Sequence, residues 1–97
     1  MSSLDVRTFV VISTAHLTEA SAKLLDRVPS ARWPCLGGVY GEYGWFLYAH
    51  EENCGTGNDE IPDDIFAVMT WARKKGFEYV LVDCDGDTVV ELPVHDW

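Results

Sequence analysis

The sequence predicts a single α+β domain over residues 1–97, built as a two-layer sandwich with two helices on one face of a mostly antiparallel sheet. Short apolar runs alternate with two amphipathic stretches in the order β-α-β-β-α-β. That order is the split βαβ pattern of ferredoxin-like folds. The length of 97 residues suits one modest core. Val89–Val90 would add a short C-terminal edge strand.

The first strand and the first helix follow from local signals. Residues 7–13 (RTFVVIS) are apolar at neighbouring positions, which predicts a strand buried on both faces and therefore central. Thr18 is a favourable N-cap residue, and apolar side chains at helical spacing follow it up to Pro29. We expect a helix over 18–28.

The middle of the chain predicts a hairpin and a second helix. Residues 39–40 and 45–50 are apolar and flank the turn sequence Gly41–Gly44. Pro62 is suited to a helix start and Gly76 to the position after its end. Acidic residues follow Pro62 and basic residues precede Gly76, which complements the helix dipole.

The final strands are expected to form a second hairpin. Val80–Val82 would form its first strand, Asp85-Gly86 its turn and Val89–Val90 its second strand. Asp-Gly between apolar runs favours a two-residue type I′ turn.

The charge of the chain limits the classes of partner that we expect it to bind. Sixteen acidic residues outweigh seven basic ones, for a formal net charge of -9, and residues 33–72 contain no Lys or Arg. Such a field repels nucleic acid and anionic membranes and attracts basic proteins. We therefore expect neither direct nucleic-acid binding nor membrane binding.

Other features indicate a cytoplasmic protein. No apolar run approaches the roughly 18 residues that a membrane span needs. The N-terminus has no secretory-signal pattern. The three cysteines are odd in number and widely spaced, which favours reduced thiols.

The candidate partner-binding residues are two groups of carboxylates and Tyr43. Tyr43 is included because it lies in the predicted hairpin turn and exposed aromatic residues are favoured interface anchors. The first group is Glu51, Glu52, Asp59, Glu60, Asp63 and Asp64, and the second is Asp83, Asp85 and Asp87. Gathered on one side, they could occupy the DNA-binding channel of a basic partner. Their alternative interpretation is solvated surface that keeps a small domain soluble.

A divalent-metal protein or small hydrolase is the alternative from another class. It would use the Asp83, Asp85 and Asp87 turn with His50 or His95. An EF-hand is not matched, because Thr88 stands at the sixth position and Val94 at the twelfth. A turn built from Asp and Gly is the simpler interpretation.

The remaining motifs predict no cofactor. Residues 50–54 hold a His, a Cys and two Glu without a second ligand pair at zinc-site spacing. Residues 54–58 hint at a phosphate loop but lack its lysine. We expect solvated loop residues there, and structural or solvent-facing roles for His16 and His95.

The middle strand also raises the question of an open sheet face. Trp45 and Leu47 would point to one side and Phe46 and Tyr48 to the other. Because both helices of a ferredoxin-like domain cover one face, either the tail at 93–97 or another chain, such as a second copy in a homodimer, would cover the other.

The chain resembles a family of small uncharacterised bacterial proteins carried mainly on plasmids, phages and integrative elements. The resemblance spans nearly the whole chain and lies in Ser13–Thr18 (STAHLT) leading into a helix, Tyr79–Leu81 followed by Asp83, Asp85 and Asp87-Thr88, then Leu92-Pro93 and Asp96-Trp97. It implies a mobile-element setting and supplies no activity and no catalytic residues. By analogy, small acidic proteins of that setting include anti-CRISPR and anti-restriction inhibitors, some of which imitate DNA charge.

The sequence therefore predicts a non-enzymatic acidic binding protein that inhibits or modulates a basic, nucleic-acid-handling partner. The metal protein or hydrolase and the homodimeric interaction module remain the alternative hypotheses.

Overall fold

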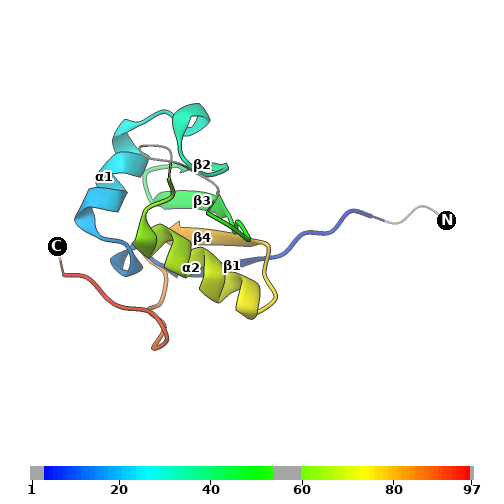
Figure 1. Cartoon of the computed structure of the whole chain (residues 1–97). Coiled ribbons are helices and arrows are strands. Elements are labelled where there is room, and N and C mark those ends of the chain that lie inside the picture. The colour runs from blue at the N-terminus through cyan, green and yellow to red at the C-terminus, as the bar shows by residue number, and fades with distance from the viewer. Residues whose placement is uncertain (1–3, 54–59, 97) are drawn as a thin grey trace.

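A computed structural model describes residues 4–53 and 60–96 as an α+β fold with a four-stranded mixed sheet and two α-helices (Figure 1). The strands are β1 (Phe9–Ser13), β2 (Gly37–Tyr40), β3 (Gly44–Tyr48) and β4 (Tyr79–Asp83). The helices are α1 (Glu19–Arg27) and α2 (Asp63–Lys74), with short 3-10 turns η1 (Thr14–His16) and η2 (Ser30–Arg32).

The strand order corrects the predicted ferredoxin-like topology. The order is β1-β4-β3-β2, with β1 parallel to β4 and the other pairs antiparallel. A ferredoxin-like sheet would place β1 between β3 and β4. Here β1 is an edge strand, although both of its faces carry apolar side chains, and β4 takes the central place.

The prediction that Val89–Val90 forms the second strand of the last hairpin, at the edge of the sheet, is also wrong. Both sides of β4 are already paired, to β1 and to β3, so no free edge remains for residues 89–90. A turn forms one residue earlier than expected, at Cys84-Asp85, with the Gly86 N–H donating to the Asp83 carbonyl at 2.9 Å. It is not type I′, because within the described chain only Gly41 and Gly76 have positive φ. The chain then passes the end of β1, where the Ser13 N–H donates to the Asp87 carbonyl at 3.0 Å.

Both predicted helices and the first predicted hairpin are confirmed. The Thr18 hydroxyl caps α1 by accepting from the Ser21 N–H at 3.2 Å. Pro62 is the N-cap of α2, and Gly76 follows its end with φ of 92°. The turn joining β2 and β3 closes with the Tyr43 N–H donating to the Tyr40 carbonyl at 3.0 Å.

The core lies between the helices and one face of the sheet. Ile12, Trp45, Leu47, Val80 and Val82 supply the sheet side of this core. The apolar stripes of α1 and α2 complete it, with Ala22, Leu25, Ile65, Val68, Met69 and Ala72 buried. Across the described ranges, no helix is long and apolar enough to cross a membrane.

The C-terminal segment packs against η1 and α2 and is held by His16. The Val89 N–H donates to His16 Nε2 at 2.9 Å, so Nδ1 carries the proton and donates to the Pro93 carbonyl at 2.8 Å. The His95 N–H donates to the Ala15 carbonyl at 2.7 Å, and Leu92 joins the core. His16 thus has the structural role expected of it, and residues 91–93 lie beside α2 on the helix side of the sheet.

Candidate partner-binding site

Two aspartates of the predicted C-terminal group meet at the end of β4. The Asp83 carboxylate accepts from the Asp85 N–H at 3.0 Å, which fixes the turn. Oxygens of Asp83 and Asp85 and the sulfur of Cys84 all lie within 4.8 Å of one another. Asp87 is exposed and does not belong to this group.

The hairpin of β2 and β3 brings Tyr43 to the same place. The Cys84 N–H donates to the Tyr43 carbonyl at 2.7 Å. This approach requires a glycine at position 44, because a Cβ there would lie 1.7 Å from the Val82 carbonyl oxygen. Tyr43 is 55% exposed beside the turn, as its predicted role as an interface anchor requires.

A hollow of about 280 Å³ opens where this turn faces α1 and η1. We call it the acidic cleft. Two carboxylates, two aromatic rings, a thiol and a hydroxyl line it, namely Asp26, Glu42, Tyr43, Trp45, Cys84 and Thr14.

Among the described residues that line the acidic cleft there is no lysine or arginine. Asp26 of α1 and Glu42 of the hairpin turn are exposed, and in the described part of the chain neither has a Lys or Arg within 4.0 Å. An adjoining hollow along α1 shares Asp26 and Trp45, and its one lysine, Lys23, pairs with Glu19 at 3.0 Å. The cleft therefore presents unpaired negative charge beside aromatic rings.

Cys84 is a weak nucleophile in this setting. Desolvation, then the neighbouring Asp85 and Asp83 carboxylates, raises the pKa of its thiol. The thiolate that nucleophilic chemistry needs is correspondingly scarce near neutral pH.

Asp64, which the sequence assigned to partner binding, is committed to the fold. Its carboxylate accepts from the Thr18 N–H at 2.8 Å, the Thr18 hydroxyl at 3.1 Å and the Ser21 hydroxyl at 2.6 Å. The start of α2 is thereby joined to the start of α1. Because α1 follows β1, and β1 ends beside Asp83, the exposed Asp63 lies toward the same end of the sheet as the acidic cleft.

Glu51 lies at the opposite end of the sheet. It follows β3, whose last residue Tyr48 pairs with Tyr79, the first residue of β4, whereas Asp83 is the last. Those ends of β4 are about 13 Å apart at the usual strand rise. Glu51 also pairs with Arg73 at 3.4 Å. The first predicted group is therefore divided.

The other members of that group add little to the cleft. Glu52 and Glu60 are exposed, and Asp59 lies outside the described residues.

The structure brings some of the residues of the metal-binding alternative together and separates others. Asp83, Cys84 and Asp85 are close enough to share an ion. His50 lies near Tyr48, at the far end of β4, with ring centroids 5.0 Å apart. With His50 the predicted ligand set is split between two ends of the sheet, whereas the His95 N–H donates to the Ala15 carbonyl, just beyond the end of β1 that pairs with Asp83. The metal hypothesis stays a prediction.

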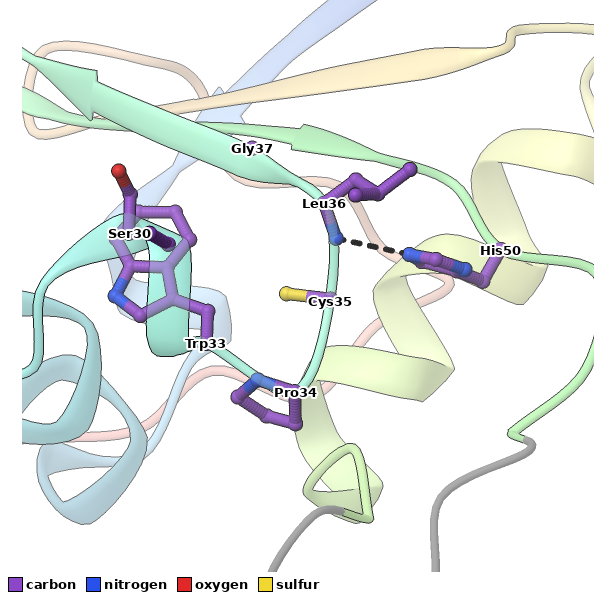
Figure 2. Close-up of a pocket in the computed structure, with 8 residues that line it drawn as sticks. Ser30, Trp33, Pro34, Cys35, Leu36, Gly37 and His50 are labelled. Atoms are coloured by element: carbon purple, nitrogen blue, oxygen red, sulfur yellow. Dashed lines mark hydrogen bonds between the residues drawn. The ribbon is translucent and has the colours of Figure 1, made fainter.

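A second hollow, of about 370 Å³, contains a cysteine and a histidine (Figure 2). The His50 Nε2 accepts from the Leu36 N–H at 3.0 Å, so it cannot also take a proton from a thiol. Burial raises the pKa of Cys35 to about 11, and in Figure 2 its sulfur points away from the His50 ring. The pair lacks the arrangement of a nucleophile and its base.

Comparison with known proteins places the chain in a family. The molecule is an α+β protein with a four-stranded mixed sheet of order 1-4-3-2 and two helices. The chain belongs to the family of unknown function DUF5983, whose C-terminal domain model matches residues 9–97. No curated protein and no solved structure matches the chain.

Sequence reasoning missed Asp26 and Glu42 as members of a site. They lie in segments far from Asp83 in the sequence, and each is an ordinary exposed carboxylate by itself. The available signal was the turn Gly41–Gly44, whose glycines allow close approach to another strand.

Proposed function

We propose that this protein is a non-enzymatic binding protein that inhibits or modulates a basic, nucleic-acid-handling partner through the acidic cleft. The observation that carries the proposal is the meeting of Asp26 and Glu42 with Tyr43 and Trp45 around one hollow whose described lining residues include no lysine or arginine. The excess of carboxylates over the whole chain supports the same partner class.

The chemistry of the cleft suits an arginine side chain. The N–H groups at the edge of a guanidinium can donate hydrogen bonds to carboxylates while its face stacks on an aromatic ring. Asp26 and Glu42 would supply the carboxylates and Tyr43 the exposed ring. Asp83 and Asp85 beside Cys84 would extend the negative field that attracts the partner.

A non-enzymatic role is consistent with the state of the cysteines and of His16 in the described residues; Cys54 lies outside them. The pKa values of both Cys35 and Cys84 are raised, and both ring nitrogens of His16 are engaged in hydrogen bonds to the C-terminal segment. The mobile-element setting, and with it an anti-CRISPR-like or DNA-imitating role, comes from the resemblance alone and is part of the proposal.

The test is competition with DNA. Partners captured by the immobilised protein would be identified, purified and titrated at low and high salt, with duplex DNA as competitor. We expect a basic nucleic-acid-binding protein that DNA displaces. The double variant Asp26→Asn/Glu42→Gln should weaken its binding by about tenfold, or roughly 1.4 kcal/mol.

The matched control is Glu60→Gln/Glu91→Gln, which removes the same charge from exposed positions outside the cleft. It should leave affinity within about twofold, a change of only ~0.4 kcal/mol. Equal losses in both double variants would show that only total charge matters. Binding that ignores salt and DNA would reject the proposal.

A further inference from the structure

The face of the sheet opposite the core is a continuous layer of apolar and aromatic side chains. Directly opposed residues in neighbouring strands share a face. By that register Phe9, Val11, Tyr79, Leu81, Phe46, Tyr48 and Tyr40 all point away from the helices. We call this set the aromatic face.

Ring contacts hold the aromatic face in one arrangement. Phe46 stacks on Tyr79 at 5.2 Å between centroids, and Phe9 meets the Phe46 ring edge-on at 5.5 Å. Tyr48 contacts Tyr79 at 5.5 Å, and the Arg73 guanidinium lies 5.4 Å from the Tyr48 ring centroid. Four rings are thus preorganised across three strands, which lowers the entropic cost of binding.

Much of this face is open to solvent. Phe9 is 50% exposed, Val11 42% and Tyr40 44%. Arg73 of α2 reaches the face at Tyr48. The core residues of both helices pack on the opposite face, and the C-terminal segment is held on that helix side by His16. Residues 93–96, which the sequence suggested as a possible cover for this face, therefore do not cover it.

The rim of the face is acidic. Arg7 donates to Asp5 at 3.0 Å and to Glu78 at 2.8 Å, and those contacts raise its pKa. Arg73 is likewise engaged by Glu51. Asp83 stands on the same face at the far end of β4 without a lysine or arginine within 4.0 Å in the described part. The nearby cations are paired, so the uncompensated charge is negative.

A second copy of the chain fits this face poorly. Four strands of about five residues give a footprint of roughly 19 by 17 Å, or about 300 Å². Stable interfaces bury about 800 Å² on each partner. Two copies would also bring together two acidic rims on chains that each carry a net charge of -9.

We infer that the aromatic face binds an apolar surface flanked by arginine or lysine residues on the same basic protein that the acidic cleft attracts. The inference rests on the proposed function and adds the apolar half of its interface. Tyr40 and Tyr43, whose ring centroids are 6.1 Å apart, connect the aromatic face with the acidic cleft. One partner that contacts both the aromatic face and the acidic cleft would bury an area closer to that of a stable interface, which neither site supplies alone.

The probes are two helical peptides with the same arginines, one with leucines along its apolar side and one with serines in their place. Each would be titrated by calorimetry into the wild-type protein and into Phe9→Ser/Val11→Ser. The control is Val90→Ser, which changes a 98% exposed valine outside the face. Circular dichroism would check that the variants fold.

We expect the leucine peptide to bind at least about fivefold more tightly than the serine peptide, a gain of ~1 kcal/mol. The face variant should remove that gain, and Val90→Ser should preserve it. Equal binding of the two peptides, or no effect of the face variant, would overturn the inference. So would a concentration-dependent dimer in sedimentation equilibrium that the face variant dissolves, or binding of a thymidine oligonucleotide.

The two proposals fail in different ways. If Asp26→Asn/Glu42→Gln weakens both peptides while the face variant changes neither, the acidic cleft stands and the aromatic face does not. If only the face variant weakens the leucine peptide, the aromatic face stands and the cleft does not.

Discussion

At the scale of single residues, the carboxylates of this chain divide into those that hold the fold and those that face solvent. Asp64 accepts three hydrogen bonds from Thr18, the N-cap of α1, and from Ser21 in its first turn, and Ser21 is only 4% exposed. Asp26 and Glu42 are exposed and unpaired at the acidic cleft. A sequence count treats these acids alike, whereas their environments assign them opposite roles.

Replacing Asp64 should therefore destabilise the protein. Asp64→Ala leaves the Thr18 N–H and the Ser21 hydroxyl without their charged acceptor, and we expect a loss of about 2–3 kcal/mol in the free energy of unfolding. Asp63→Ala, at the exposed neighbouring position, should cost only about 0.3–1 kcal/mol through the helix dipole. Urea denaturation of both variants provides the measurement, and equal losses would contradict the role given to Asp64.

His50 should make stability depend on pH. Burial, then the charge of Arg73, lowers its pKa in the folded protein below the usual 6.5. As the pH falls below 6.5, the unfolded chain binds a proton that the folded chain resists, so protonation favours unfolding. The imidazolium would also lose the acceptor that Nε2 offers to the Leu36 N–H.

The measurement compares wild type with His50→Gln by chemical denaturation at pH values above and below 6.5. We expect the wild type to lose more stability than the variant on acidification, because titration of the carboxylates is common to both. Parallel loss in the two proteins would contradict this account.

At the scale of elements, the close approach of the β2–β3 hairpin to β4 builds the acidic cleft. At Gly44 a Cβ would lie 1.7 Å from the Val82 carbonyl oxygen, whereas at Gly38 a Cβ would meet nothing within 4 Å. We expect Gly44→Ala to cost about 3 kcal/mol or more, since backbone must move to admit it. Gly38→Ala should change stability by less than about 1 kcal/mol.

Thermal unfolding of the two alanine variants tests this contrast within one hairpin. A Gly44→Ala protein as stable as Gly38→Ala would show that the hairpin does not need to pack so closely against β4.

Elements were predictable where their signals are local. Thr18, Pro62 and Gly76 each mark a helix end through their own conformational preferences, and the structure confirms them. Strand order has no such signal. Residues 7–13 are apolar on both faces because one face is core and the other is the aromatic face, so a pattern that indicated a central strand belongs to an edge.

The candidate site was predictable only in part for the same reason. Asp83, Asp85 and Tyr43 could be proposed from turn chemistry, and all three lie at or beside the cleft. Asp26 and Glu42 reach it only because β3 pairs with β4 while α1 packs near Trp45. Those contacts depend on the whole sheet.

At the scale of the whole molecule, the described structure contains few ion pairs to offset its charge. The salt bridges among the described residues join Arg7, Lys23, Arg73 and Lys75 to nearby carboxylates, on a chain whose net charge is -9. Every cation in them is at least partly exposed, where such pairs contribute little. Repulsion among the remaining carboxylates therefore opposes the compact state.

Salt should stabilise this protein. Raising NaCl from about 10 mM to about 150 mM shortens the Debye length from ~30 Å to ~8 Å, which screens repulsion across the whole molecule. We expect the melting temperature to rise by about 4–8 °C, equivalent to roughly 1 kcal/mol for a domain of this size. Differential scanning calorimetry provides the measurement.

The charge-reversed variant Glu42→Lys/Asp85→Lys, which brings the net charge toward zero at exposed positions, should respond less to salt, because there is less repulsion left to screen. A melting temperature that falls with salt would mean that attractive pairs outweigh repulsion, and the field proposed to draw in a basic partner would then be weaker than the net charge suggests.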